Sequence, residues 1–204
     1  MQITADMQPD LGLSVTEAAR RAQILTATIG TIAEHGYAGT SFERIRERAG
    51  LSSTRIITYH FGTKQNLMTA LLGTIIHVKD RYLTERAGSG EDRVAALRAH
   101  IESELAFLRA HPSAVRALAE IARNATGEPV TDALLADLRM GRLARQLGQG
   151  QREGVFGEFD AGIMARTIAQ AVDGAAAALA DNPQLDLDAY GQELAALFEK
   201  ATAP

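Results

Sequence analysis

The sequence predicts an all-α protein of about nine helices. Apolar residues recur at spacings of three and four along most of the chain, which is the period of a helix with one buried face. Capping residues and breaks that contain glycine or proline divide these stretches into separate helices. No segment alternates apolar and polar residues as a half-buried strand does, so we expect no sheet.

The first predicted helix has the clearest start. Ser14 and Glu17 have the spacing of a capping box, in which each side chain accepts the other residue's backbone N–H. Gly36 is expected to end the helix, because glycine takes the positive φ of a helix C-terminus without strain. Residues 1–13 lack periodicity and are expected to form a flexible tail. The predicted apolar face comprises Val15, Ala18, Ala22, Leu25, Ile29 and Ile32.

A short second helix is expected over about 41–49. Thr40 and Glu43 have the spacing of a second capping box, and Gly50 is expected to end the helix. The core side chains predicted for this region and the helix that follows are Phe42, Ile45, Ile56 and Phe61.

A third short helix and a long fourth helix are expected next. Ser52 or Ser53 is expected to cap the third helix, which reaches about His60. Thr63 caps the fourth helix, whose apolar face comprises Leu67, Leu71, Ile75, Val78 and Tyr82.

Five further helices complete the prediction. Pro112 suits the first turn of the sixth helix, Asp160 caps the eighth, and Asp186 or Asp188 starts the ninth. The fifth helix carries Val94, Leu97, Ile101, Leu105 and Leu108, the sixth carries Val115, Leu118 and Ile121, the seventh covers about 131–152, the eighth reaches Asp181, and the ninth carries Tyr190, Leu194, Leu197 and Phe198.

Composition limits the classes of protein to consider. The chain has 204 residues and no cysteine, which excludes disulfides, thiol catalysis and thiolate metal sites. It has no run of eighteen apolar residues and no basic, apolar secretion signal at its start, so we expect a cytoplasmic protein that does not span a membrane. No metal-binding spacing, phosphate-binding glycine loop or nucleophile elbow is present, so we expect neither an enzyme nor a cofactor or metal site.

Charge is unevenly distributed. The net charge is −4, yet the segment 15–64 has seven basic and four acidic residues. A local basic surface can contact phosphate even when the whole protein is acidic, because only the contacting face displaces counterions.

The segment 40–64 has the arrangement of a DNA-binding helix-turn-helix. Two short helices flank a glycine-containing turn behind a longer first helix, so the second of the pair could enter a major groove. Its leading side chains are hydroxyls and one guanidinium, groups that bind base edges or phosphates. The helix starts at 40–41 and 63–64 offer free N–H groups to phosphate. The candidate DNA-binding residues are Thr40, Ser41, Arg44, Ser52, Ser53, Thr54, Arg55, Thr58, Tyr59, His60 and Lys64.

This segment resembles the tetracycline-repressor (TetR) family of bacterial regulators. The resemblance covers about 15–72 and rests on HGYAGTS after the first helix, FERIRERAGLS, TYHF at 58–61, and Lys64 with Leu67 in K-x-x-L. It implies a helix-turn-helix domain over 14–62, and a ligand-binding and dimerisation domain over 63–204. It further implies a homodimer on palindromic double-stranded operator DNA, and repression relieved by a small molecule. It places Thr40, Tyr59, His60 and Lys64 at phosphates, and Ser53, Thr54 and Arg55 nearest the bases.

The segment departs from the family pattern at two places. Gly50 to Phe61 spans twelve residues, one more than is usual, with the extra residue near Ser52 and Ser53. Thr58 stands where an aromatic residue is common. The first departure leaves open which side chain reads which base. Arg44, Arg46 and Arg48 alternate with glutamates, so ion pairing is an alternative to DNA contact.

The rest of the chain predicts a dimer surface and candidates for a ligand pocket. The last two long helices have apolar stripes, with small residues at 174–178 that allow close approach, and two such helices from each chain would form a four-helix interface. The candidates for ligand contact are polar or soft residues that interrupt apolar faces, namely His77, Phe107, His111, Asn124, Met140 and Asp173.

Two other interpretations remain open. A helical dimer that binds a protein partner would account for the bundle but would leave the polar front of the third helix without a role. An activator of transcription would have the same DNA contacts as a repressor. The effector itself cannot be identified from these residues.

Overall fold

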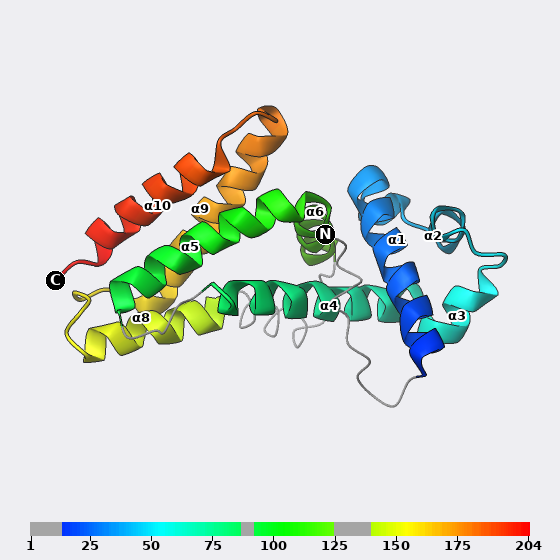
Figure 1. The fold of residues 1–204 in the computed structure, drawn as a ribbon, viewed down its shortest axis with the longest axis horizontal. Coiled ribbons are helices and arrows are strands. Elements are labelled where there is room, and N and C mark those ends of the chain that lie inside the picture. The colour runs from blue at the N-terminus through cyan, green and yellow to red at the C-terminus, as the bar shows by residue number, and fades with distance from the viewer. Residues whose placement is uncertain (1–13, 87–91, 125–139) are drawn as a thin grey trace. The chain divides into compact units, whose positions relative to one another are not determined.

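The computed structural model describes residues 14–86, 92–124 and 140–204, and within these ranges it has nine helices and no strand (Figure 1). The predicted all-α class is confirmed. Contacts divide the chain into two compact units. The first contains the described residues of 1–80 and 111–127, and the second contains those of 81–110 and 128–204.

Helix α1 is the main packing partner within the first unit. The helices of this unit are α1 (Val15–Gly39), α2 (Phe42–Ala49), α3 (Arg55–Phe61), α4 (Lys64–Thr84) as far as residue 80, and α6 (Pro112–Asn124). α1 packs against both α2 and α6. The predicted capping box is confirmed: the Ser14 hydroxyl accepts the Glu17 N–H at 3.3 Å, and Glu17 Oε2 accepts the Ser14 N–H at 3.0 Å.

The buried surface of α1 is wider than the predicted stripe. The stripe is buried from Ala22 to Ile32. Val15, which was predicted to begin this apolar face, is 83% exposed, because it lies in the first turn of the helix, where little packs against it. Ile24, Thr28 and Thr31 are buried as well. Each threonine hydroxyl donates to the carbonyl four residues earlier, which satisfies the polar group inside the protein.

The capping box predicted for α2 is wrong by one residue. Ser41 is the N-cap, and its hydroxyl accepts the Arg44 N–H at 3.3 Å. The Thr40 hydroxyl donates to the Gly36 carbonyl at 2.8 Å. Gly36 interrupts α1 with φ 69° and ψ 174°, so its carbonyl is turned out of the regular helical ladder and is available to Thr40.

Helix α3 begins at Arg55, after a turn longer than predicted. Neither predicted serine is the N-cap. Thr54 occupies that position without a side-chain cap, while the Ser53 hydroxyl accepts the Arg55 N–H at 3.2 Å. At the next helix the prediction is confirmed, since the Thr63 hydroxyl accepts the Asn66 N–H at 3.1 Å.

The core of α2 and α3 differs from the prediction at two positions. Ile45 and Phe61 are buried as expected. Ile57 is 0% exposed, whereas Ile56 and Phe42 are only half-buried. The later start of α3 accounts for the isoleucine error, because it changes which face of the short helix is turned inward.

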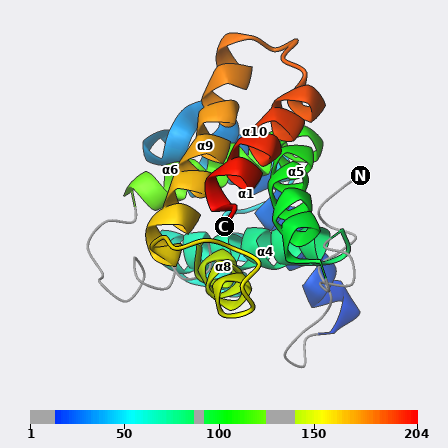
Figure 2. The ribbon, with the colours of Figure 1, turned by 90° about the vertical axis from the view of Figure 1, so that its left-hand side faces the viewer.

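The second unit is built around α5. Its helices are α5 (Arg93–Ala110), α8 (Arg142–Arg152), α9 (Ala161–Asp181) and α10 (Leu187–Thr202), with the end of α4. α5 packs against α10, and α9 contacts α5, α8 and α10 (Figure 2). Two predicted caps are confirmed, with Asp160 accepting the Ile163 N–H at 2.8 Å and Asp186 accepting two N–H groups at 3.0 Å.

Arginines of α5 join helices in this unit. Arg98 forms a bidentate pair with Glu199 of α10, at 2.7 and 2.6 Å. Arg93 forms another with Glu153, at 2.7 and 2.8 Å, and these hydrogen bonds lower the pKa of Glu153 to about 2. Val94 was wrongly placed on the apolar face of α5 and is exposed, because it lies in the first turn.

Some expectations lie partly or wholly outside the described residues. These are the flexible tail at 1–13 and the first nine residues of the predicted seventh helix, of which 140–152 is described. The predicted domain boundary at 62 and 63 stays a prediction. Contacts group the first part of α4, together with α6, with the three N-terminal helices.

The burial of Ile57 yields a stability prediction. Ile57→Ala is expected to lower the free energy of unfolding by about 2–5 kcal/mol, because it leaves a cavity at a fully buried site. The matched change Ile56→Ala, at a half-buried site, is expected to cost less than about 2 kcal/mol. Denaturant unfolding of both variants measures the difference, and equal losses would contradict the assignment of the core residue.

Candidate nucleic-acid interface

The front of α3 is polar, exposed and carries an unpaired arginine. Ser52, Arg55, Thr58 and Tyr59 are exposed, with Tyr59 at 76%. In the described part of the chain, nothing forms an ion pair or a hydrogen bond with the Arg55 guanidinium. Its five N–H donors are therefore available to an external acceptor such as a base edge or a phosphate.

The turn that presents this surface is fixed at both ends. Gly50 ends α2 with φ 64° and ψ 33°, the left-handed conformation that glycine adopts without strain. Leu51 is buried, and its N–H donates to the Arg46 carbonyl at 3.0 Å. With Leu51 buried before the turn and Ile57 buried after it, the residues between them are held toward solvent.

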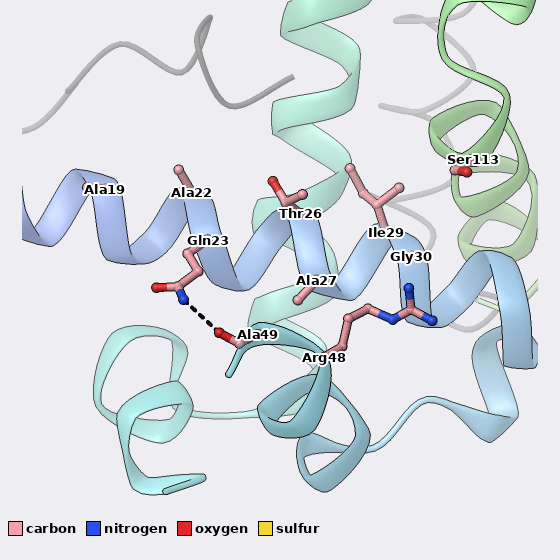
Figure 3. A pocket seen from close by; sticks show the side chains of 10 residues that line it. All are labelled: Ala19, Ala22, Gln23, Thr26, Ala27, Ile29, Gly30, Arg48, Ala49 and Ser113. Carbon is pink, nitrogen blue, oxygen red and sulfur yellow. Dashed lines mark hydrogen bonds between the residues drawn. The ribbon is translucent and has the colours of Figure 1, made fainter. Parts of the chain in front are cut away.

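Side chains of α1 hold the C-terminal ends of α2 and α3. The Arg21 guanidinium donates to the His60 carbonyl and lies 4.2 Å from the centroid of the Phe61 ring. Gln23 Nε2 donates to the Ala49 carbonyl at 2.6 Å (Figure 3). The last carbonyls of a helix lack partners within it, so these two bonds satisfy groups that would otherwise need water.

The aromatic end of α3 lies beside this clamp. The rings of Tyr59 and His60 meet edge to face, with centroids 5.1 Å apart. His60 is half-buried, and burial, followed by the charge of Arg21, lowers the pKa of His60 below its ordinary value. The free protein therefore favours a neutral imidazole at this position.

The other phosphate candidates gather where α2 and α4 begin. Lys64 Nζ donates to the Tyr37 carbonyl at 3.0 Å and lies 4.7 Å from the Tyr37 ring centroid, and burial lowers the pKa of Lys64. Ser41 is exposed at the N-terminus of α2, whereas Thr40 is only 2% exposed. The phosphate contact of Thr40 stays a prediction, and the neighbouring Ser41 is the more accessible hydroxyl.

The three arginines of α2 have partners within the protein. Arg46 forms ion pairs with Glu43 at 2.7 Å and Glu47 at 3.4 Å. Arg48 pairs with Glu34 of α1. Arg44, the one of the three predicted to bind DNA, donates to the Gly39 carbonyl and is exposed. Ion pairing on this helix is thus observed for Arg46 and Arg48.

A groove with a volume of about 760 Å³ lies in the same unit. Small side chains of α1 line most of it, and α2 and Ser113 of α6 supply the rest (Figure 3). Arg48 extends toward Gly30, where an added Cβ would lie 2.8 Å from Nη1. None of the six predicted ligand-binding residues lines this groove.

The predicted ligand-binding residues are divided between the two units. His77, His111 and Asn124 belong to the first unit, and His77 and Asn124 are exposed while His111 is buried. Phe107, Met140 and Asp173 belong to the second. Phe107 is buried with its ring 5.4 Å from that of Tyr82, Met140 is half-buried and Asp173 is exposed. Their contact with a ligand stays a prediction.

Among the described residues there is neither a candidate metal site nor a helix that could span a membrane. No group of three or more histidine, aspartate or glutamate side chains there could hold a metal ion. No helix in the same part of the chain has the length and apolar character needed to cross a bilayer.

Sequence interpretation missed the two α1 side chains that clamp α2 and α3. Arg21 and Gln23 lie 39 and 26 positions from their partners along the chain. A polar residue beside the apolar stripe of a helix has the same local pattern whether it faces solvent or another helix. No short-range signal could therefore have identified them.

Residues 24–71 match the model of a family described as bacterial regulatory proteins, tetR family. The match begins within α1, contains α2 and α3 with the exposed front described above, and ends in α4. Over these residues the chain is similar to the TetR family. The resemblance noted in the sequence is thereby confirmed.

Two relatives are transcriptional regulators by name. One is the HTH-type transcriptional regulator BetI of Stenotrophomonas maltophilia, to which the chain is 34% identical over 101 residues. The aligned residues make up 49% of this chain and 51% of that protein. The other is the HTH-type transcriptional regulator RutR of Escherichia coli, to which the chain is 34% identical over 100 residues. This alignment covers 48% of this chain and 45% of that protein. The chain therefore matches about half the length of each relative.

Solved structures share the fold over a longer stretch. A TetR family transcription regulator from Marinobacter aquaeolei has a TM-score of 0.78 and 18% identity, over 90% of this chain and 95% of that one. A tetR family regulator from Shewanella has a TM-score of 0.73 and 21% identity, over 91% and 98%. At such identity these structures establish a common fold for both units.

Proposed function

We propose that this chain is a transcription regulator of the TetR family and binds specific DNA sequences. The observation that carries the proposal is the exposed polar front of α3, where the Arg55 guanidinium has no partner in the described part of the chain. An exposed guanidinium without an internal partner can make the bidentate contact with guanine that is the commonest specific contact in a major groove. The alternative of a protein-binding adaptor leaves it without a role.

Each part of the surface has a distinct role in this proposal. α3 lies in the major groove, where Arg55 with Ser52, Ser53 and Thr54 faces the bases. Phosphates on either side are bound by Ser41, Tyr59 and Lys64, with Arg44, Thr58 and His60 at the edge of the contact. Phosphate contacts position the protein and base contacts give the sequence preference.

Selection of binding sites from a random pool of duplex DNA tests this function directly. A palindromic motif is the expected result, because a two-fold symmetric dimer binds two half-sites. Failure to enrich any sequence would favour the adaptor. If the motif is found, metabolites can be screened for release of that operator.

We also propose repression, relieved by a small molecule, as the regulatory mode, and a cytoplasmic location without enzymatic activity. Support for repression comes from the family resemblance alone, and an activator would use the same DNA contacts. A reporter gene that carries the selected operator distinguishes the two, since deletion of a repressor raises expression and deletion of an activator lowers it.

A homodimer through α9 and α10 is the proposed assembly. Both helices carry large apolar side chains that the chain leaves in solvent: Ile163 is 66% exposed and Leu197 is 57% exposed. The small residues of α9 at 174–178 would let a second copy approach closely. An exposed apolar surface of this kind is typical of protein interfaces.

Arg55→Ala is expected to relax the base preference at one position of each half-site. Loss of a bidentate contact costs about 1–3 kcal/mol of discrimination. Binding-site selection with the variant measures the change. Arg152→Ala, at an exposed position of α8 in the second unit, removes the same charge and is expected to keep the motif. An unchanged motif for the Arg55 variant would remove its proposed role.

His60 is expected to make DNA binding stronger as pH falls. Its pKa is lowered in the free protein, and a nearby phosphate would raise it, so binding takes up a proton between the two values. Affinity should rise as pH falls through that interval and level off below the pKa of the free protein. His60→Gln should weaken this dependence in titrations between pH 5 and 8, whereas His35→Gln, at an exposed site, should not. Identical profiles for wild type and His60→Gln would contradict the phosphate contact.

Leu197→Glu is expected to weaken the dimer. Burying leucine contributes about 1.5–3 kcal/mol, so the dissociation constant should rise about tenfold or more. Sedimentation velocity over a range of concentrations measures it. Gln192→Glu adds the same charge at another exposed position of α10 and serves as the control. Equal constants for both variants would place the interface elsewhere.

A further inference from the structure

A carboxylate of α6 holds the turn over residues 36–41, which runs from the break in α1 at Gly36 to the N-cap of α2. Glu120 Oε2 accepts the Tyr37 backbone N–H at 3.1 Å, across 83 positions of sequence within the first unit. The Glu120 side chain is 22% exposed, and its other oxygen, Oε1, pairs with Arg123. The hydrogen bond from Tyr37 is the main cause that lowers the pKa of Glu120 below its ordinary value.

The peptide group between Gly36 and Tyr37 is bound on both sides. Its N–H donates to Glu120, and its carbonyl, on Gly36, accepts the Thr40 hydroxyl at 2.8 Å. The next carbonyl, on Tyr37, accepts Lys64 Nζ at 3.0 Å and the Thr40 N–H at 3.2 Å. The position of this turn therefore affects both the start of α2 and the Lys64 ammonium.

Glycine at position 36 is what lets the peptide group turn toward α6. Its φ of 69° lies in the region that residues with a Cβ rarely adopt. An added Cβ would also lie 3.3 Å from Glu120 Oε2, a tight contact. The positive φ of Gly36 directs the Tyr37 N–H toward the Glu120 carboxylate, so this hydrogen bond depends on the backbone conformation of the turn.

We propose that Glu120 is a positioning residue for DNA binding, which fixes the turn that places Ser41 and Lys64 at the phosphates. The inference rests on the proposed DNA-binding function. Glu120 itself carries the same sign of charge as DNA and does not contact it. It acts through the Tyr37 peptide, and a charge-assisted hydrogen bond is about twice as strong as a neutral one.

The direction in which DNA affinity changes when Glu120 is replaced distinguishes a positioning role from a general effect of its charge. Removal of a negative charge from a DNA-binding protein should strengthen its binding to a polyanion. If Glu120 positions the turn, Glu120→Ala should instead weaken binding to duplex DNA by about tenfold, as expected for loss of one hydrogen bond to a charged group. Glu120→Gln keeps an acceptor oxygen without the charge and should fall between wild type and Glu120→Ala.

The experiment compares Glu120→Ala, Glu120→Gln and the control Glu47→Ala in the full chain. Glu47 is an exposed residue of α2, so its variant removes the same charge in the same unit and should bind DNA equally or more tightly. Affinity is measured on the selected operator and on an unrelated duplex at low salt. Glu120→Ala should bind both the operator and the unrelated duplex more weakly than wild type, because the phosphate contacts are independent of the DNA sequence.

Amide hydrogen exchange of residues 36–41 in the DNA-free protein gives a second measurement. Exchange should be faster in Glu120→Ala than in wild type and unchanged in Glu47→Ala, with the unfolding midpoint recorded to verify folding. Unchanged exchange in Glu120→Ala, or faster exchange with undiminished DNA affinity, would overturn the positioning role. A wild-type protein that binds no duplex at all would instead overturn the proposed function and this role with it.

Discussion

Helices of eight and seven residues are too short to be stable in water, so α2 and α3 depend on their packing against longer helices. α1 provides that support. It buries apolar residues over more than one face and donates side-chain hydrogen bonds from Arg21 and Gln23 to carbonyls at the ends of α3 and α2. The exposed front of α3 is rigid because its back and its C-terminal end are both attached to α1.

Local chemistry allowed much of this arrangement to be predicted from the sequence. The caps at Ser14, Thr63 and Asp160 and the glycine stop at Gly50 depend on residues within a few positions of each other, and all four are present in the structure. The spacing of apolar residues likewise located the buried face of α4, because a long amphipathic helix has one consistent period.

The errors and omissions share a physical origin. Which of Ile56 and Ile57 is buried depends on where α3 begins. That start depends on the conformation of the turn, in which Leu51 is buried and the Ser53 hydroxyl accepts the Arg55 N–H. Glu120 gave no signal in the sequence, because its partner is a backbone N–H 83 positions away. Thr40 was wrongly predicted to cap α2, because its hydroxyl is directed to the Gly36 carbonyl by a backbone conformation that spacing alone does not specify.

Charge on the proposed DNA-binding surface is less than a count of arginines suggests. Arg46 and Arg48 are already neutralised by glutamates. The chain as a whole carries a net charge of −4, so general attraction to DNA is weak. The affinity of such a protein for DNA therefore depends on a few specific contacts, which are lost on DNA of another sequence. Its binding should be selective where a uniformly basic surface would be indiscriminate.

The turn over 50–54 has a consequence for protein engineering. Because Leu51 and Ile57 are both buried, the path between them is fixed in length, and the direction of every side chain on α3 is tied to that path. A recognition helix transplanted from a relative with a shorter turn would be rotated about its own axis by the missing residue. Under the proposed function, transfer of a DNA specificity from such a relative therefore requires the turn and the helix to be moved together as one segment.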